Sequence, residues 1–156
     1  MRIHQLVQSQ ELPLSLEAAW DFLSNPGNLN EITPPELQFR ILSGADKPMF
    51  EGQIITYKIR VAPMIWQSWV TEIKCVIPGK SFIDEQRFGP YKFWHHRHSL
   101  EAKDENTTIM HDEINYGLGF GIFGEIAHAV YVRKKLESIF AFRRQVLEER
   151  FGKSRE

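Results

Sequence analysis

The chain has 156 residues, 42% of them hydrophobic and 25% charged, with a formal net charge of -1, which predicts one domain over residues 1–156. This near-neutral charge gives no reason to expect a nucleic-acid partner, and the single cysteine excludes an intramolecular disulfide and a four-thiolate zinc site. No apolar run approaches the roughly 20 residues of a membrane helix, and residues 1–13 lack the apolar region of a signal peptide, which predicts a cytoplasmic protein without stable membrane insertion.

The N-terminal part of the chain changes its hydrophobic period twice. A loose alternation that ends at Pro13 predicts a strand, and apolar residues at helical spacing after Ser15 predict a helix with this serine as its N-cap. A short second helical turn follows, and Pro34 then predicts extended backbone. The expected elements are one strand and two helices, at residues 3–12, 15–23 and 28–32.

The middle of the chain alternates β-rich runs with short turn signals, as expected for an antiparallel meander. In the run over residues 65–77 we expect Trp69 to point inward, Trp66 to lie near the rim, and Cys75 to be a small core residue. Six strands are predicted, at residues 37–42, 53–61, 65–77, 81–88, 91–102 and 107–116.

The last element is a long amphipathic helix predicted over residues 125–150, which corresponds to about 39 Å at 1.5 Å per residue. Its apolar stripe consists of Ala129, Val132, Leu136, Ile139, Phe140, Val146 and Leu147. The order β-α-α-β6-α leaves one sheet face and one helix stripe that must cover each other. We therefore predict an α+β domain in which a curved antiparallel sheet of about seven strands wraps the C-terminal helix around an internal cavity.

A glycine-rich stretch, residues 117–124, precedes this helix and superficially resembles a phosphate-binding loop. It lacks the βαβ context of such loops, so we interpret it as the mouth of the cavity. Its apolar residues form either a mobile lid or a rigidly packed turn, and they are Leu118, Phe120, Ile122 and Phe123.

The strongest chemical signal lies in the run over residues 91–102, where Trp94, His96 and His98 share one strand face because strand side chains alternate. If neighbouring strands turn matching faces inward, carboxylate, amide and phenol groups join them in a mostly apolar wall, which is typical of a small-molecule pocket. The candidate ligand-binding residues are Trp69, Asp84, Gln86, Trp94, His96, His98, Asp112, Tyr116 and Phe120. Arg87 and Arg97 have the opposite parity and are expected at the surface.

Three roles are open for the histidines. His96 and Asp112 could form a structural hydrogen-bond network, because a buried carboxylate or imidazole needs a partner. A His/Asp pair could also transfer protons, with Tyr116 as a hydrogen-bond donor. A His-x-His pair with a carboxylate could hold a metal ion, but this signal is weak and we predict no metal and no cofactor.

Several motifs in order give the chain a resemblance to a known superfamily. They are Pro13 with Ala18, Trp20 and Phe22, Asn25-Pro-Gly-Asn-Leu29, Thr33-Pro-Pro-Glu-Leu-Gln-Phe39, Asp84-Glu-Gln86, Gly89-Pro-Tyr91, Trp94-x-His96-x-His98 and Asp112-x-Ile-x-Tyr116. Over nearly its whole length the chain resembles the START-like, helix-grip superfamily (SRPBCC), and more narrowly a bacterial branch often labelled cell-division-inhibitor-like. The resemblance implies a hydrophobic cavity between the sheet and the long helix.

Members of this superfamily include binders, transporters and enzymes, and the fold alone does not decide among them. We expect a protein that binds or carries a hydrophobic or amphipathic small molecule, rather than an enzyme. The first alternative is a cyclase, dehydratase or hydrolase that uses His96 or His98 with Asp112. The second is an interaction module on the long helix, which requires an exposed apolar patch. The sequence indicates no particular partner protein.

Overall fold

The computed structural model of the chain describes residues 1–62 and 64–153. Strands and helices follow one another in the predicted order; η1 is the predicted second helical turn, and η2 is an additional short helical segment. The elements are β1 (His4–Leu12), α1 (Leu16–Leu23), η1 (Pro26–Asn30), η2 (Pro35–Leu37), β2 (Arg40–Ser43), β3 (Ile54–Ala62), β4 (Ile65–Ile77), β5 (Ser81–Phe88), β6 (Phe93–Asp104), β7 (Thr107–Gly117), α2 (Gly121–Ala127), η3 (His128–Val132) and α3 (Arg133–Phe151).

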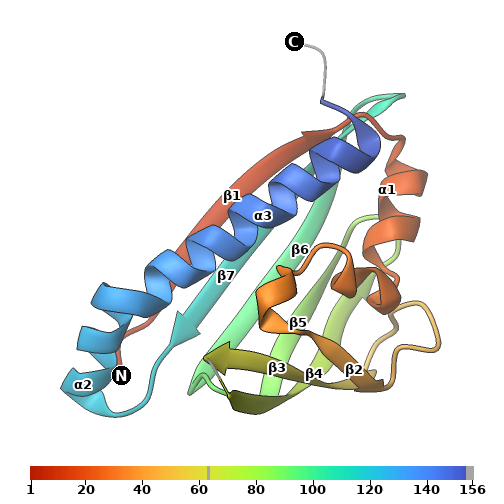
Figure 1. The fold of residues 1–156 in the computed structure, drawn as a ribbon. Helices are drawn as coiled ribbons and strands as arrows, with labels where there is room; N and C mark the ends of the chain where they lie inside the picture. The colour runs from red at the N-terminus through yellow and green to blue at the C-terminus, as the bar shows by residue number, and fades with distance from the viewer. Residues whose placement is uncertain (63, 154–156) are drawn as a thin grey trace.

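The seven strands form one antiparallel sheet in the order β1-β7-β6-β5-β4-β3-β2. Strands β2 to β7 pair with their neighbours in sequence, so the predicted meander is confirmed, and β1 closes the sheet beside β7. Figure 1 shows α3 running along β1 and β7. Helix α1 lies near the C-terminal end of α3, and α2 lies at the opposite end. The chain therefore has the helix-grip arrangement that the element order predicted.

The N-terminal helices begin where their capping residues place them. Ser15 is the N-cap of α1, because its hydroxyl accepts a hydrogen bond from the backbone N–H of Ala18 at 3.3 Å. The Asn25 side chain caps η1, so this helical turn spans Pro26–Asn30 and starts earlier than predicted. The expectation of extended backbone is wrong for Pro35–Leu37, since a proline suits the first turn of a helix.

The C-terminal helix also begins earlier than predicted, because α2, η3 and α3 follow one another without a break from Gly121 to Phe151. Its buried residues in α3 are Leu136, Phe140, Arg143 and Leu147. Ala129, expected on the buried stripe, is exposed. It lies in η3, a π-helical segment whose wider turn rotates the side chains before α3 away from the stripe. Among the described residues no helix is long and apolar enough to span a membrane.

The prediction that Cys75 is a core residue is wrong, because its side chain is exposed. The register between β4 and β5 shifts between Lys74 and Ile77, and Cys75 has a positive φ of 52°. One extra residue on β4 forms a β-bulge here and reverses the alternation. Val76 consequently packs against the core in its place.

Gly124 of α2 allows a close approach of the preceding loop. A Cβ at this position would lie 2.0 Å from the carbonyl oxygen of Gly119 and 3.3 Å from Cβ of Leu118. A Cβ at Gly119 itself would meet nothing within 4 Å. The glycine-rich stretch is thus a tight loop joined to a helix N-terminus.

We expect Gly124→Ala to lower the free energy of unfolding by about 1–3 kcal/mol, because the added methyl group must displace backbone. Gly119→Ala is the matched control, and we expect a change within about 0.5 kcal/mol. Urea denaturation of both variants measures the difference. Equal stabilities of the two variants would contradict the proposed close approach.

Candidate functional site

A cavity of about 340 Å³ lies between the sheet and the C-terminal helix. Most of its wall is aromatic or aliphatic and includes Ile55, Trp69, Ile73, Trp94, Leu136 and Phe140. The polar side chains on the wall include a carboxylate, two imidazoles and a guanidinium group, from Asp84, His96, His98 and Arg143. The site therefore combines a large apolar volume with one compact polar group.

The strand register brings the polar residues together. Asp84 of β5 lies opposite His96 of β6, and His98 of β6 lies opposite Asp112 of β7. Side chains two apart on a strand share a face, so all four point to the same side of the sheet. The predicted convergence of these residues from three neighbouring strands is confirmed.

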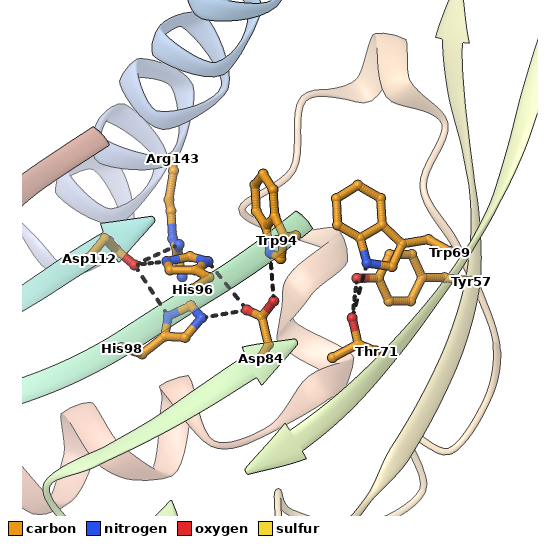
Figure 2. A network of polar contacts seen from close by, with 9 residues as sticks. All are labelled: Tyr57, Trp69, Thr71, Asp84, Trp94, His96, His98, Asp112 and Arg143. Carbon is orange, nitrogen blue, oxygen red and sulfur yellow. Dashed lines mark hydrogen bonds and ion pairs between the residues drawn. The ribbon is translucent and has the colours of Figure 1, made fainter. Parts of the chain in front are cut away.

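In this four-residue network (Asp84, His96, His98 and Asp112) each carboxylate contacts both imidazoles, as Figure 2 shows. Oδ2 of Asp84 lies 2.8 Å from Nε2 of His98 and 3.3 Å from Nδ1 of His96. Oδ1 of Asp112 lies 2.8 Å from Nε2 of His96 and 3.2 Å from Nδ1 of His98. The two rings face each other with their centroids 3.7 Å apart. The two shorter contacts have hydrogen-bond geometry.

Two further side chains hold the carboxylates from outside the network. The indole Nε1 of Trp94 donates to Oδ1 of Asp84 at 2.9 Å, and Nη1 of Arg143 donates to Oδ1 of Asp112 at 3.2 Å. His96, His98, Asp112 and Arg143 are all buried. If both imidazoles were neutral, the carboxylates of Asp84 and Asp112 would carry two negative charges against the single positive charge of Arg143. One proton on an imidazole balances these charges.

The pKa values follow from these contacts. Burial lowers the pKa of His96, but the Asp84 carboxylate and the hydrogen bonds to both aspartates outweigh it and hold this pKa above its usual value. Burial would raise the pKa of Asp84, and the two imidazoles outweigh it, so this pKa lies below its usual range. For Asp112, the Arg143 guanidinium and both imidazoles likewise overcome burial and lower the pKa. The ionised carboxylates and a protonated His96 stabilise each other.

A second polar cluster on the cavity wall is internally satisfied. The indole Nε1 of Trp69 donates to Oγ1 of Thr71 at 3.1 Å. The hydroxyl of Tyr57 lies 2.9 Å from the same oxygen (Figure 2). These groups therefore fix the orientation of the aromatic rings that line this part of the cavity.

Five of the nine candidate residues line the cavity, namely Trp69, Asp84, Trp94, His96 and His98. The cavity wall does not include Asp112, which holds both imidazoles from behind. Tyr116 is buried beyond the wall, where its hydroxyl lies 2.8 Å from Nε2 of His128. These two residues support the site without lining it.

The other two candidates lie away from the cavity. The side-chain amide of Gln86 donates to the carbonyl of Tyr91 at 2.6 Å and accepts from its N–H at 3.1 Å, so it braces the turn between β5 and β6. Phe120 has 90% of its surface exposed, because it occupies the N-cap of α2 in a left-handed conformation. Neither residue lines the cavity, and their role in ligand binding stays a prediction.

The sequence analysis missed Arg143, which lines the cavity and contacts Asp112. The signal was present in the helical spacing. Residue 143 lies seven positions after Leu136 and four before Leu147, both of which are buried. An arginine in phase with a buried stripe requires a partner inside the protein.

One group of three described residues could hold a metal ion, because ligand atoms of Asp84, His96 and His98 lie within 4.8 Å of one another. Both imidazoles already contact the Asp84 and Asp112 carboxylates. A metal ion would compete with these contacts for the same ligand atoms, and the prediction of no metal stays a prediction.

The placement of the cavity mouth at residues 117–124 stays a prediction. Leu118 and Tyr131 line the cavity, whereas Ile122 and Phe123 have 72% and 76% of their surface exposed. Of the apolar residues expected in the lid or turn, only Leu118 lines the cavity. Phe120, Ile122 and Phe123 are thus exposed apolar residues at the start of the C-terminal helix, and the interaction-module hypothesis stays a prediction.

No family model matches the chain, and no curated protein sequence is similar to it. Solved structures resemble it closely in fold. A START superfamily protein from Mycobacterium smegmatis is 13% identical, with a TM-score of 0.71 over 95% of this chain and 97% of that chain. The Zhui aromatase/cyclase from Streptomyces sp. R1128 is 14% identical, with a TM-score of 0.66 over 95% and 96%.

Norcoclaurine synthase from Thalictrum flavum, solved in complex with dopamine and hydroxybenzaldehyde, is 13% identical with a TM-score of 0.65 over 99% of this chain and 90% of that chain. At these identities the likeness concerns the fold. The chain has the helix-grip fold of START-like proteins, with a seven-stranded antiparallel sheet and a long C-terminal helix.

We expect Asp112→Asn to lower the free energy of unfolding by about 3–5 kcal/mol, because it leaves the buried Arg143 and the imidazoles without their anionic partner. Glu113→Gln is the matched control, since it makes the same chemical change one residue along β7, on the opposite face. Its effect should stay within about 0.5 kcal/mol. Urea denaturation measures both, and similar losses in the two variants would contradict the central role of Asp112.

We also expect the free energy of unfolding to fall as pH rises above about 6.5, the usual imidazole pKa. His96 has a raised pKa, so in this range the folded state binds more protons than the unfolded state. One such proton gives a slope of at most about 1.4 kcal/mol per pH unit. The aspartates have lowered pKa values and stay ionised in both states there.

Chemical denaturation at several pH values measures this slope. His96→Gln should flatten it, whereas His95→Gln, on the other face of β6, should leave it unchanged. A wild-type stability that is constant or rises over this range would show that His96 does not hold the extra proton.

Proposed function

We propose that this protein binds, and can carry, a hydrophobic or amphipathic small molecule in the cavity between the sheet and α3. The observation that carries the proposal is a cavity of about 340 Å³ whose wall is mostly aromatic and aliphatic, with Asp84, His96, His98 and Arg143 gathered in one polar group. Small-molecule sites typically have this size, this apolar lining and a few polar groups that orient the ligand. A ligand with an apolar body and one polar end fits this distribution.

The aromatic side chains of the cavity wall favour a ligand whose apolar part is rigid or aromatic. Trp69, Trp94 and Phe140 line the cavity, and the edges of Trp69 and Trp94 are held by hydrogen bonds to Thr71 and Asp84. Aromatic rings that are fixed in this way provide flat surfaces whose positions need not be reorganised when a ligand enters.

An enzyme of the cyclase, dehydratase or hydrolase type is the less well supported alternative. A general base needs one nitrogen within reach of the substrate, with its other nitrogen held. Both ring nitrogens of His96 and of His98 lie within 3.3 Å of carboxylate oxygens. Nε2 of each imidazole is held by a hydrogen bond, whereas Nδ1 of His98 is buried without a hydrogen-bond partner among the described residues and is the atom that a proton-transfer role would use.

The cellular location, the narrower family branch and the absence of a nucleic-acid partner remain proposals. A cytoplasmic location is consistent with the exposed, unpaired thiol of Cys75, which suits a reducing compartment. Membership of the bacterial branch labelled cell-division-inhibitor-like rests on the order of the sequence motifs alone. No contact with nucleic acid is expected, given the net charge of -1.

Binding of an apolar fluorophore such as Nile red tests the proposal, together with mass spectrometry of small molecules released from the denatured protein. Ile139→Trp fills the cavity from α3, and we expect affinity to fall by about tenfold or more, which corresponds to about 1.4 kcal/mol. Ser138→Trp, on the exposed side of the same helix, is the matched control and should keep wild-type affinity. If wild-type protein binds no apolar probe and releases no small molecule, the proposal fails.

A further inference from the structure

Arg143 is a charged residue in the buried stripe of α3. Only 7% of its side-chain surface is exposed, and it lines the cavity beside His96 and His98. Leu136, Phe140 and Leu147 occupy the rest of the stripe. Arginine is almost never buried without partners, so each of its donors should be accounted for.

The contacts of Arg143 account for only part of its guanidinium group. Nη1 donates to Oδ1 of Asp112 at 3.2 Å, whereas Nε and Nη2 are buried and have no hydrogen-bond partner among the described residues. That one oxygen of Asp112 is shared with nitrogens of His96 and His98. Arg143 therefore does not form the paired, two-bond contact that a guanidinium fork makes with a free carboxylate.

The acceptors around Arg143 are already used. Oδ1 of Asp84 accepts from Trp94, and its Oδ2 contacts both imidazoles. The hydroxyls of Tyr57 and Thr71 contact each other. At the polar end of the cavity the carboxylate oxygens that contact Arg143 or the imidazoles are thus shared among several donors, whereas Nε and Nη2 of Arg143 and Nδ1 of His98 have no hydrogen-bond partner among the described residues.

From this asymmetry we infer that Arg143 determines ligand specificity by binding a hydrogen-bond acceptor, a carboxylate or a carbonyl oxygen, on the polar end of the ligand. This inference rests on the proposed binding function. An acceptor placed at Nε and Nη2 would satisfy two donors that otherwise stay unpaired. An ammonium group has no acceptor to offer and would lie next to a guanidinium of the same charge. The ligand class is therefore an apolar, preferably aromatic, carboxylate, ketone or aldehyde.

Four probes with one aromatic skeleton test the inference: naphthalene, acetonaphthone, naphthoate and naphthylmethylamine. Calorimetric or fluorescence titration of wild-type protein measures each affinity. We expect at least one acceptor-bearing probe to bind about tenfold or more tightly than naphthalene, because a site built with donors discriminates against analogues that lack the acceptor. The amine should gain nothing. The ketone and carboxylate arms separate a neutral acceptor from an anionic one.

Arg143→Met should abolish the preference for the acceptor-bearing probe while naphthalene affinity is retained. Arg144→Met is the matched control, because Arg144 donates to the carbonyl of Ser9 and does not line the cavity. It should keep the preference. Arg143→Lys retains a positive charge beside Asp112 and should lose most of the preference, since it lacks the fork.

A measurement on wild-type protein covers the case in which the Arg143 variants do not fold. The nitrogen NMR signal of Arg143 Nε–H should shift when the acceptor-bearing probe binds and change much less with naphthalene. Equal affinity for naphthalene and both acceptor-bearing probes would overturn the inference and leave the binding function intact. A preference that persists in Arg143→Met would do the same. If none of the four probes binds while Nile red does, the inference is overturned and the binding function stands; if Nile red does not bind either and no small molecule is released, both fail.

Discussion

Two buried carboxylates at one end of the cavity must be neutralised for this fold to be stable. Asp84 and Asp112 lie on strands that flank β6, and the imidazoles of His96 and His98 fill the space between them. A buried charge without a partner is far more destabilising than a buried apolar group. The chain meets this requirement with His96, whose pKa the carboxylates hold above its usual value, and with the guanidinium of Arg143.

This charge balance also connects the two layers of the molecule. The network joins β5, β6 and β7, and Arg143 attaches α3 to it from across the cavity. The other contacts between α3 and the sheet are apolar ones, through residues such as Leu136, Phe140 and Leu147, and two hydrogen bonds that join Arg144 to Ser9 and Gln10 of β1. Apolar contacts have little directional preference, whereas the Arg143–Asp112 contact has a defined geometry. The network therefore determines where the helix lies relative to the polar end of the cavity.

The same arrangement shapes what the cavity can do. Because the imidazole nitrogens and the carboxylate oxygens hold one another, few of these groups are free to react with a substrate. Arg143 and His98 are exceptions, since Nε and Nη2 of Arg143 and Nδ1 of His98 have no hydrogen-bond partner in the described part of the protein. A cavity with an apolar wall and unpaired donors at one end is better suited to orienting a ligand than to transforming it.

Sequence alone determined the element order, the meander and the grouping of Asp84, His96, His98 and Asp112. These follow from local rules, namely the alternation of strand side chains and the pairing of successive strands through short turns. Only the tertiary structure decided the outcomes that depend on a bulge, a cap or a helix phase. Cys75 is exposed because a bulge shifts β4, Gln86 is held by the turn at Tyr91, and Phe120 caps α2 outside the cavity. Arg143 becomes part of the site because α3 is positioned on the sheet so that its guanidinium reaches Asp112. No residue spacing within the chain specifies this position of the helix on the sheet.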